Sequence, residues 1–149
     1  MGPVVTTGSR LNVVTSQKDE LSRGMLAKRT GVNLETVRYY EKIALMPEPL
    51  RSTGGHRVYG PLDLRRLLFI KRCRDLGFTL QETRELLELV DGGDYTCAEI
   101  RDRTSSHLHD VDAKIRDLSK MRGTLRKMVA RCDGGLVPEC PIVDDLLVI

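Results

Sequence analysis

Aromatic residues and long apolar stretches are the two features that this 149-residue sequence has least of. Aromatic side chains make up 4% of the chain, with two Phe and no Trp. A large β-sandwich or barrel is therefore not expected, because such cores depend on aromatic and β-branched strand residues. Apolar runs are only a few residues long, whereas a membrane-spanning helix needs roughly 20 residues. With 40% hydrophobic and 30% charged residues, the composition predicts a soluble protein with no membrane partner.

Signals for secretion and for catalysis are also missing. Residues 1–20 have no apolar segment of the kind that a secretion signal carries, so they predict a disordered N-terminal extension and a cytoplasmic location. The Gly54-Gly55 pair is too short for a phosphate-binding loop, and no Lys-Ser/Thr helix start follows it. No nucleophile–base pair can be argued from the sequence, which therefore predicts no enzyme activity.

The modest net charge of +3 is unevenly distributed along the chain. Residues 21–90 contain 13 Lys or Arg against 8 Asp or Glu, whereas residues 91–149 contain 9 against 11. A basic first half joined to a mildly acidic second half predicts a module that faces nucleic acid, followed by a segment with another task.

Residues 24–42 have the pattern of two short helices joined by a tight turn. A helix over Gly24–Thr30 is closed by Gly31, and Asn33 can cap a second helix over Leu34–Lys42. Helix, tight turn with glycine, and helix is the layout of a helix-turn-helix motif.

A small hairpin and two further helices are predicted next. The Gly-Gly pair within Arg51–Tyr59 indicates a hairpin, and Pro61 suits the first turn of a helix that ends near Leu76. Thr79 and Glu82 form a capping box that opens another helix, which we expect to end at Val90. Residues 21–90 thus predict a winged helix-turn-helix with two connector helices, in a mainly all-α fold.

A second capping box, formed by Thr96 and Glu99, opens a long helix predicted over Cys97–Arg131. Apolar residues recur along it at intervals of three and four, with Arg122 the one interruption: Leu108, Val111, Ile115, Leu118, Leu125 and Val129. Because the rest of the chain offers nothing to cover this stripe, residues 91–131 predict an antiparallel coiled-coil homodimer. His107 and His109 are interpreted as solvated surface residues.

Three of the four cysteines have a spacing that matters. Cys97 and Cys132 are 35 residues apart, which places them on one coiled-coil face but roughly 50 Å apart in one helix. Antiparallel pairing would bring Cys97 of one chain to Cys132 of the other, and residues 132–149 form a loop and a short turn that can return Cys140 to the same place. This geometry predicts a three-thiolate pocket at each end of the dimer; three unrelated buried cysteines are the alternative. Cys73, in the middle of a helix, is interpreted as a packing residue.

Thiolate is the expected form of these cysteines, because a helix N-terminus such as that at Cys97 lowers the pKa of a thiol. Soft thiolates select soft or borderline ions, namely Cu(I), Hg(II), Cd(II), Pb(II) and Zn(II).

Basic and aromatic side chains gather on the second helix and on the hairpin. They are Arg38, Tyr39 and Tyr40 on the helix and Arg51, Arg57 and Tyr59 on the hairpin. Arg and Tyr suit phosphate contacts, and a helix in the major groove can read base edges. A solvated basic surface with packed tyrosines is the alternative, but a helix-turn-helix beside a wing favours DNA.

Five segments of the sequence resemble the mercury-resistance regulator (MerR) family. They are Ala27–Val32, Glu35–Glu41, Gly55–Tyr59, Asp75–Leu80 and Cys140–Ile142. The resemblance covers about residues 21–146. It implies a dimer that binds a palindromic operator between two promoter elements set too far apart for RNA polymerase. Such a dimer represses there, and it activates by twisting the DNA once metal binds.

The resemblance also implies site residues. Family members contact DNA at the positions of Arg38, Arg51, Arg57, Tyr59 and Arg74, and His56 occupies a further wing position. Cys97, Cys132 and Cys140 occupy the three thiolate positions of the members that bind divalent metals. A third thiolate favours Hg(II), followed by Zn(II), Cd(II) and Pb(II). Cu(I) competes, because the loop after Cys132 looks like that of the copper(I) branch, which has Ser at the position of Cys97.

Three residues depart from the family pattern. The family usually has an aliphatic residue near Arg23, a glycine at Ala44 and an aromatic residue at His56. Arg23 predicts an irregular start to the first helix. A cysteine-based redox sensor and a structural zinc site that holds a dimer together are the rival interpretations of the cysteines.

Overall fold

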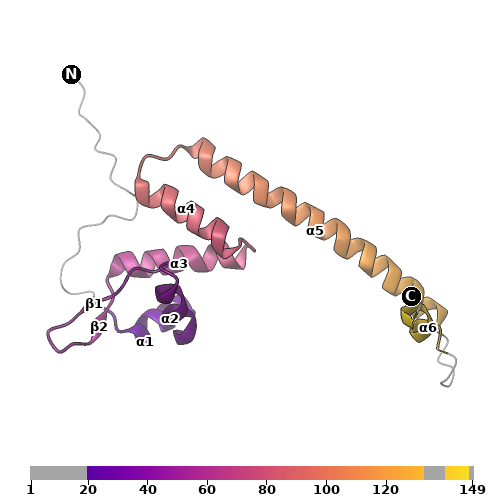
Figure 1. Cartoon of the computed structure of the whole chain (residues 1–149), viewed down its shortest axis with the longest axis horizontal. Helices are drawn as coiled ribbons and strands as arrows, with labels where there is room; N and C mark the ends of the chain where they lie inside the picture. Colours follow the sequence, from indigo (N-terminus) through magenta and orange to yellow (C-terminus); the bar gives the residue numbers. More distant parts are fainter. Residues whose placement is uncertain (1–19, 133–139, 148–149) are drawn as a thin grey trace. The chain divides into compact units, whose positions relative to one another are not determined.

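The structure is a computed structural model that describes residues 20–132 and 140–147. Its described elements are six helices and two short strands, so the chain is mainly helical (Figure 1). The chain divides into two compact units, one up to Arg103 and one from Thr104, which are described separately. The expected disordered extension at residues 1–20 lies outside the described residues, except for Glu20.

The first unit begins with the predicted helix-turn-helix. Helix α1 spans Arg23–Thr30 and helix α2 spans Leu34–Lys42. The turn between them contains Gly31 in the left-handed region (φ 69°), and the Asn33 side chain accepts a hydrogen bond from the backbone of α2. The predicted glycine turn and the predicted Asn33 cap are therefore both confirmed.

The start of α1 differs from expectation. The Ser22 side chain caps the helix by accepting a hydrogen bond from the Met25 backbone N–H. Arg23 is the first helical residue, and its side chain turns toward α2, where it forms an ion pair with Glu41. The expected irregular start is therefore wrong, because the serine cap satisfies the helix end regardless of the residue that follows it.

The wing is a two-stranded antiparallel hairpin of β1 (Leu50–Arg51) and β2 (Arg57–Val58). Arg51 lies directly opposite Arg57 in this register. An isolated bridge joins Leu21 to Tyr59, the residue after β2, so the hairpin is tied to the segment that leads into α1.

Helices α3 (Pro61–Asp75) and α4 (Leu80–Gly92) complete the support for the helix-turn-helix. The Thr79–Glu82 capping box at the start of α4 is present as predicted. The main core lies between these elements and consists of Leu21, Leu26, Val37, Tyr40, Leu45, Met46, Tyr59, Leu67, Ile70 and Leu87. The predicted fold class, a winged helix-turn-helix followed by a long helix, is confirmed.

Helix α5 spans Cys97–Arg131, 35 residues, as predicted, and the Thr96–Glu99 capping box opens it. Helix α6 spans Pro141–Leu147, after residues that lie outside the described part of the chain (Figure 1). His109 is exposed, but His107 is only 6% exposed, so the interpretation of His107 as a solvated residue is wrong. None of the described helices combines the length and the apolar character needed to span a membrane.

Candidate DNA interface and thiolate site

Helix α2 presents Arg38 and Tyr39 to solvent. Arg38 pairs with Glu35 one turn earlier, at 2.7 Å between Nη1 and Oε1. Both side chains are more than half exposed, and such surface pairs contribute little, about 0–1 kcal/mol. The Arg38 guanidinium can therefore exchange this partner for a phosphate or a base edge at small cost.

The wing concentrates three exposed cationic or polar side chains, Arg51, His56 and Arg57. Because Arg51 and Arg57 are directly opposed in the antiparallel register, their side chains leave the same face of the hairpin. Like charges opposite each other destabilise a sheet. The Arg51 Nη1 donates to the Gly55 carbonyl within the wing at 3.0 Å. An anion bound between the two guanidinium groups would relieve their repulsion.

Two tyrosines expected at this interface are buried instead. Tyr40 is 7% exposed and Tyr59 is 1% exposed, and both belong to the main core. The Tyr59 hydroxyl donates to Glu41 and accepts from Arg23 Nε at 3.0 Å. Burial, followed by the hydrogen bond to Glu41, raises the pKa of Tyr59 to about 12. The expectation that these two rings contact DNA directly is therefore wrong, because neither ring faces solvent.

Arg74 lies in the last turn of α3 and is exposed. Its guanidinium donates to the Phe78 carbonyl, so it braces the turn between α3 and α4. The remaining donors of the guanidinium group stay accessible for a phosphate contact, because an arginine carries five N–H donors.

The turn that follows α2 is held by two arginines that the sequence analysis did not single out. Arg84 of α4 donates to the Ile43 carbonyl at 2.6 Å, and Arg66 of α3 donates to the Leu45 carbonyl at 2.8 Å. Arg66 also forms an ion pair with Asp91 at 2.6 Å. Cationic donors stabilise carbonyl groups at a helix C-terminus, so these bonds fix the end of α2 against both connector helices.

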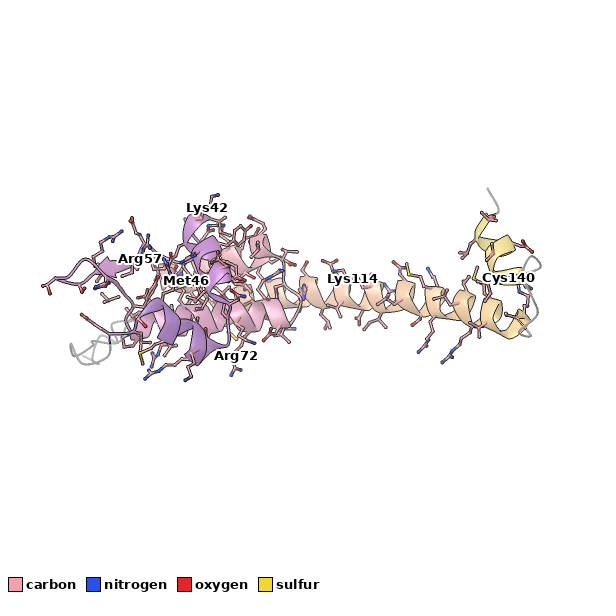
Figure 2. All side chains as sticks on the ribbon, turned by 90° about the horizontal axis from the view of Figure 1, so that it is seen from below. Lys42, Met46, Arg57, Arg72, Lys114 and Cys140 are labelled. Carbon is pink, nitrogen blue, oxygen red and sulfur yellow. The ribbon has the colours of Figure 1, made fainter. Side chains whose placement is uncertain are left out.

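The three candidate metal ligands lie at the ends of helices. Cys97 is the first residue of α5, Cys132 follows its last residue, and Cys140 immediately precedes α6 (Figure 2). Cys97 and Cys132 are exposed and Cys140 is half-buried, so all three thiols are accessible. Within residues 20–132 and 140–147, no three His, Cys, Asp or Glu side chains of one chain form a metal site. The donor set is nevertheless the one that soft ions prefer.

Cys73 differs from these three cysteines. It is 7% exposed and packs with Phe78 and Leu86 in a second, smaller cluster. Burial raises the pKa of its thiol, which disfavours the reactive thiolate form. Its interpretation as a packing residue is confirmed.

One side of α5 is apolar and uncovered in the single chain. Its exposed large apolar residues are Leu108, Ile115, Leu118, Met121, Leu125 and Val129. Leu118, Met121, Leu125 and Val129 also line a shallow groove along the helix. A contiguous exposed apolar face that extends over several helical turns is rare on a monomeric soluble protein and usually marks an interaction surface.

Comparison with known proteins identifies the family. The family model described as "MerR HTH family regulatory protein" matches residues 21–90, and "MerR, DNA binding" matches residues 64–128. The chain is also similar to a mercuric resistance operon regulatory protein from Bacillus cereus. The two are 42% identical over 125 residues, which cover 83% of this chain and 95% of the relative. The chain belongs to the MerR family.

Solved structures of MerR-family proteins resemble it as well. A transcription regulator from Ralstonia metallidurans in complex with lead(II) is 37% identical, with a TM-score of 0.73, over 85% of this chain and 98% of the other. A MerR regulator from Bacillus megaterium in complex with mercury(II) is also 37% identical. Its TM-score is 0.65, over 82% of this chain and 95% of the other.

Proposed function

We propose that this MerR-family chain is a homodimeric transcription regulator that binds promoter DNA and responds to a soft metal ion through Cys97, Cys132 and Cys140. The observation that carries the proposal is that accessible thiols stand at both ends of one helix with an uncovered apolar face. The relatives named for mercury and the solved relatives with lead(II) and mercury(II) support the class of ion.

The proposed DNA interface combines a recognition helix with a wing. Helix α2 would enter the major groove with Arg38 and Tyr39, while Arg51, His56 and Arg57 of the wing contact the backbone. Arg74 adds a further phosphate contact. An Arg57→Ala variant should weaken binding to all duplexes about equally and lower the slope of log affinity against log salt by about one.

The proposed dimer forms through α5. Antiparallel pairing of two copies would cover the apolar face, and each fully buried Leu or Val contributes about 1.5–3 kcal/mol. Leu125→Asp should therefore dissociate the dimer, as measured by sedimentation equilibrium. Lys127→Asp is the matched control, because it places the same charge two residues away on the opposite side of the helix. Equal behaviour of the two variants would contradict an interface on the apolar face.

The proposed metal site is completed by the partner chain. Cys97 would join Cys132 and Cys140 of the partner subunit, giving three thiolates at each end of the dimer. Cys97 is exposed at the start of α5, so its thiol is accessible to a partner chain and to an ion. Three thiolates suit a divalent ion, so we expect Hg(II) first and Zn(II), Cd(II) or Pb(II) next. Cu(I) is the alternative if Cys97 does not take part.

The proposed regulation follows the family pattern. Without metal, the dimer holds the operator between two overspaced promoter elements and represses. In the metal-loaded state, the dimer distorts the DNA so that RNA polymerase engages both elements.

Run-off transcription with RNA polymerase and a panel of Hg(II), Pb(II), Cd(II), Zn(II) and Cu(I) tests this proposal. Cys97→Ser should lose the response to divalent ions and keep DNA binding. Cys73→Ala is the matched control, because it removes a buried thiol that no proposed site uses. Unchanged activation by Cys97→Ser would remove Cys97 from the site, and no response of the wild-type protein to any ion would refute metal gating.

A thiol redox sensor is the second candidate, since Cys97 and Cys132 are exposed thiols. Activation by peroxide in chelator-treated protein, reversed by a dithiol reductant, would favour it. A structural zinc site is excluded as the function if metal-free protein remains dimeric and binds the operator.

A further inference from the structure

Three polar side chains meet between the helix-turn-helix and the wing. Arg23 is the first residue of α1, Glu41 lies in the last turn of α2, and Tyr59 follows β2. Their hydrogen bonds form a closed triangle: Arg23 Nη2 donates to Glu41 Oε2 at 2.7 Å, Arg23 Nε donates to Tyr59 Oη at 3.0 Å, and Tyr59 Oη donates to Glu41 Oε1.

The triangle is well shielded from water. The side chains of Arg23 and Glu41 are each 13% exposed, and Tyr59 is 1% exposed. Each oxygen of the Glu41 carboxylate accepts a bond from a different element, one from α1 and one from the wing. A buried charged group needs such partners, because an unpaired one costs several kcal/mol. The three side chains therefore hold one another in a single arrangement.

The wing depends on its attachments to the rest of the unit for its orientation. Its strands are two residues long, and an isolated two-stranded hairpin is marginal in water. Tyr59 is also the residue whose backbone pairs with Leu21, through bonds of 2.8 and 2.9 Å. The same residue thus ties the hairpin to the start of α1 by its backbone and to α2 by its hydroxyl.

We propose that Arg23, Glu41 and Tyr59 act as positioning residues, a polar clamp that sets the orientation of the wing relative to α2 before DNA is bound. The clamp would fix the spacing between Arg38 on α2 and Arg57 on the wing, so that both meet the duplex together. A preorganised interface binds more tightly, because less conformational freedom is lost on association. This inference rests on the proposed DNA binding of the chain. It assigns the clamp residues no DNA contact of their own.

A double-mutant cycle separates positioning from general stabilisation. The probe is a duplex selected from a random-sequence library by the wild-type protein, and affinity is measured by fluorescence anisotropy at several KCl concentrations. Tyr59→Phe keeps the buried ring and removes both hydroxyl bonds; it should weaken binding about tenfold. In this background Arg57→Ala should cost clearly less than in the wild type, whereas the cost of Arg38→Ala should be unchanged. Tyr95→Phe, in the loop between α4 and α5, is the matched control and should leave affinity unchanged.

Each outcome decides one question. If the effects of Tyr59→Phe and Arg57→Ala on affinity are simply additive, the clamp proposal is refuted. It is also refuted if Tyr59→Phe leaves the slope of log affinity against log KCl unchanged, because a displaced wing would lose phosphate contacts. If the wild-type protein selects no duplex, the proposed DNA binding itself fails. If circular dichroism shows that Tyr59→Phe is not folded, the same double-mutant cycle is measured with Arg23→Leu in its place, and Arg23→Lys is the conservative rescue. In that series the lysine should restore part of the coupling, because it can still pair with Glu41.

Discussion

Ala44 offers a test of backbone strain beside helix α2. Among the described residues it is the non-glycine residue with a positive φ, 56°, and it lies just after α2. Its N–H donates to the Glu41 carbonyl at 3.1 Å, and its own carbonyl accepts from Arg84 at 3.4 Å. The turn that ends α2 therefore requires this conformation, whichever residue occupies the position.

The expected effect of Ala44→Gly is the difference between two terms. The left-handed conformation costs an L-residue roughly 1–2 kcal/mol, and glycine removes this cost. Glycine also makes the unfolded chain more flexible, which destabilises the folded state by about 0.4–1 kcal/mol. Because the Ala44 side chain is exposed, no buried surface is lost. We therefore expect Ala44→Gly to raise the free energy of unfolding by up to about 1.5 kcal/mol.

Urea denaturation at a fixed protein concentration measures this change. Ala113→Gly, in the middle of α5, is the matched control and should destabilise by about 1 kcal/mol, because glycine is a poor helix former. Ala44→Val should also destabilise, since a β-branched residue fits a positive φ poorly. If Ala44→Gly destabilises the protein as much as Ala113→Gly does, Ala44 carries no strain that glycine can relieve.

Three further predictions concern protons and helix ends. The pKa of Tyr59 is about 12, against an ordinary value of 10.0, so the protonated hydroxyl stabilises the fold fully below pH 10. This contribution disappears as the pH rises through 12. Between pH 9 and pH 11.5, urea denaturation should therefore show a smaller loss in the free energy of unfolding for Tyr59→Phe than for the wild type. Arg84→Ala should lower the free energy of unfolding by about 1–3 kcal/mol, measured by thermal melts, because it removes the charged donor to Ile43. Hydrogen bonds from the backbone and then the side chain of Thr96 lower the pKa of Glu99, so the contribution of this carboxylate to stability is present above the ordinary pKa of 4.5 and is lost as the pH falls through the lowered pKa. Thr96→Ala removes the side-chain bond and keeps the backbone bond, so urea denaturation as a function of pH should show that it flattens this loss of stability only in part.

The helix boundaries were predictable because the signals that set them are local. Asn33, Thr79 and Thr96 each accept a hydrogen bond from a backbone N–H two or three residues further on. Such a bond depends on residue type and spacing alone, which are both visible in the sequence. The same is true of the wing, where a glycine pair between short extended segments allows the turn.

The role of Tyr59 could not be predicted, because it depends on residues that are distant in sequence. Its partners Glu41 and Arg23 lie 18 and 36 residues away. In the sequence, a tyrosine beside Arg57 is typical of a nucleic-acid surface; only the fold shows that its ring belongs to the core. Arg23 gave one indication in the sequence, because a charged residue at a position that is usually aliphatic in the family needs a polar partner in the fold. The sequence does not say which residue that partner is. The burial of His107 on a largely exposed helix is a similar case.

The thiolate site was only partly predictable for a different reason. The spacing of Cys97 and Cys132 follows from the sequence, and the structure confirms the continuous helix between them. The proposed site needs residues of two chains, and the sequence or the contacts of a single chain do not show where the residues of a second chain lie. The segment that joins Cys132 to Cys140, residues 133–139, lies outside the described residues.

Helix α4 makes polar contacts with both the start of α5 and the end of α2. Arg103 of α5 forms an ion pair with Glu85 of α4, and the neighbouring Arg84 donates to the Ile43 carbonyl at the end of α2. Glu85 and Arg84 are adjacent on α4, so this helix contacts both the first turns of α5 and the end of α2. Cys97 lies in the α5 segment that Arg103 anchors, less than two turns away. Helix α4 therefore lies between the α5 segment that carries Cys97 and the helix proposed to meet DNA, and its contacts to both are made by two consecutive residues.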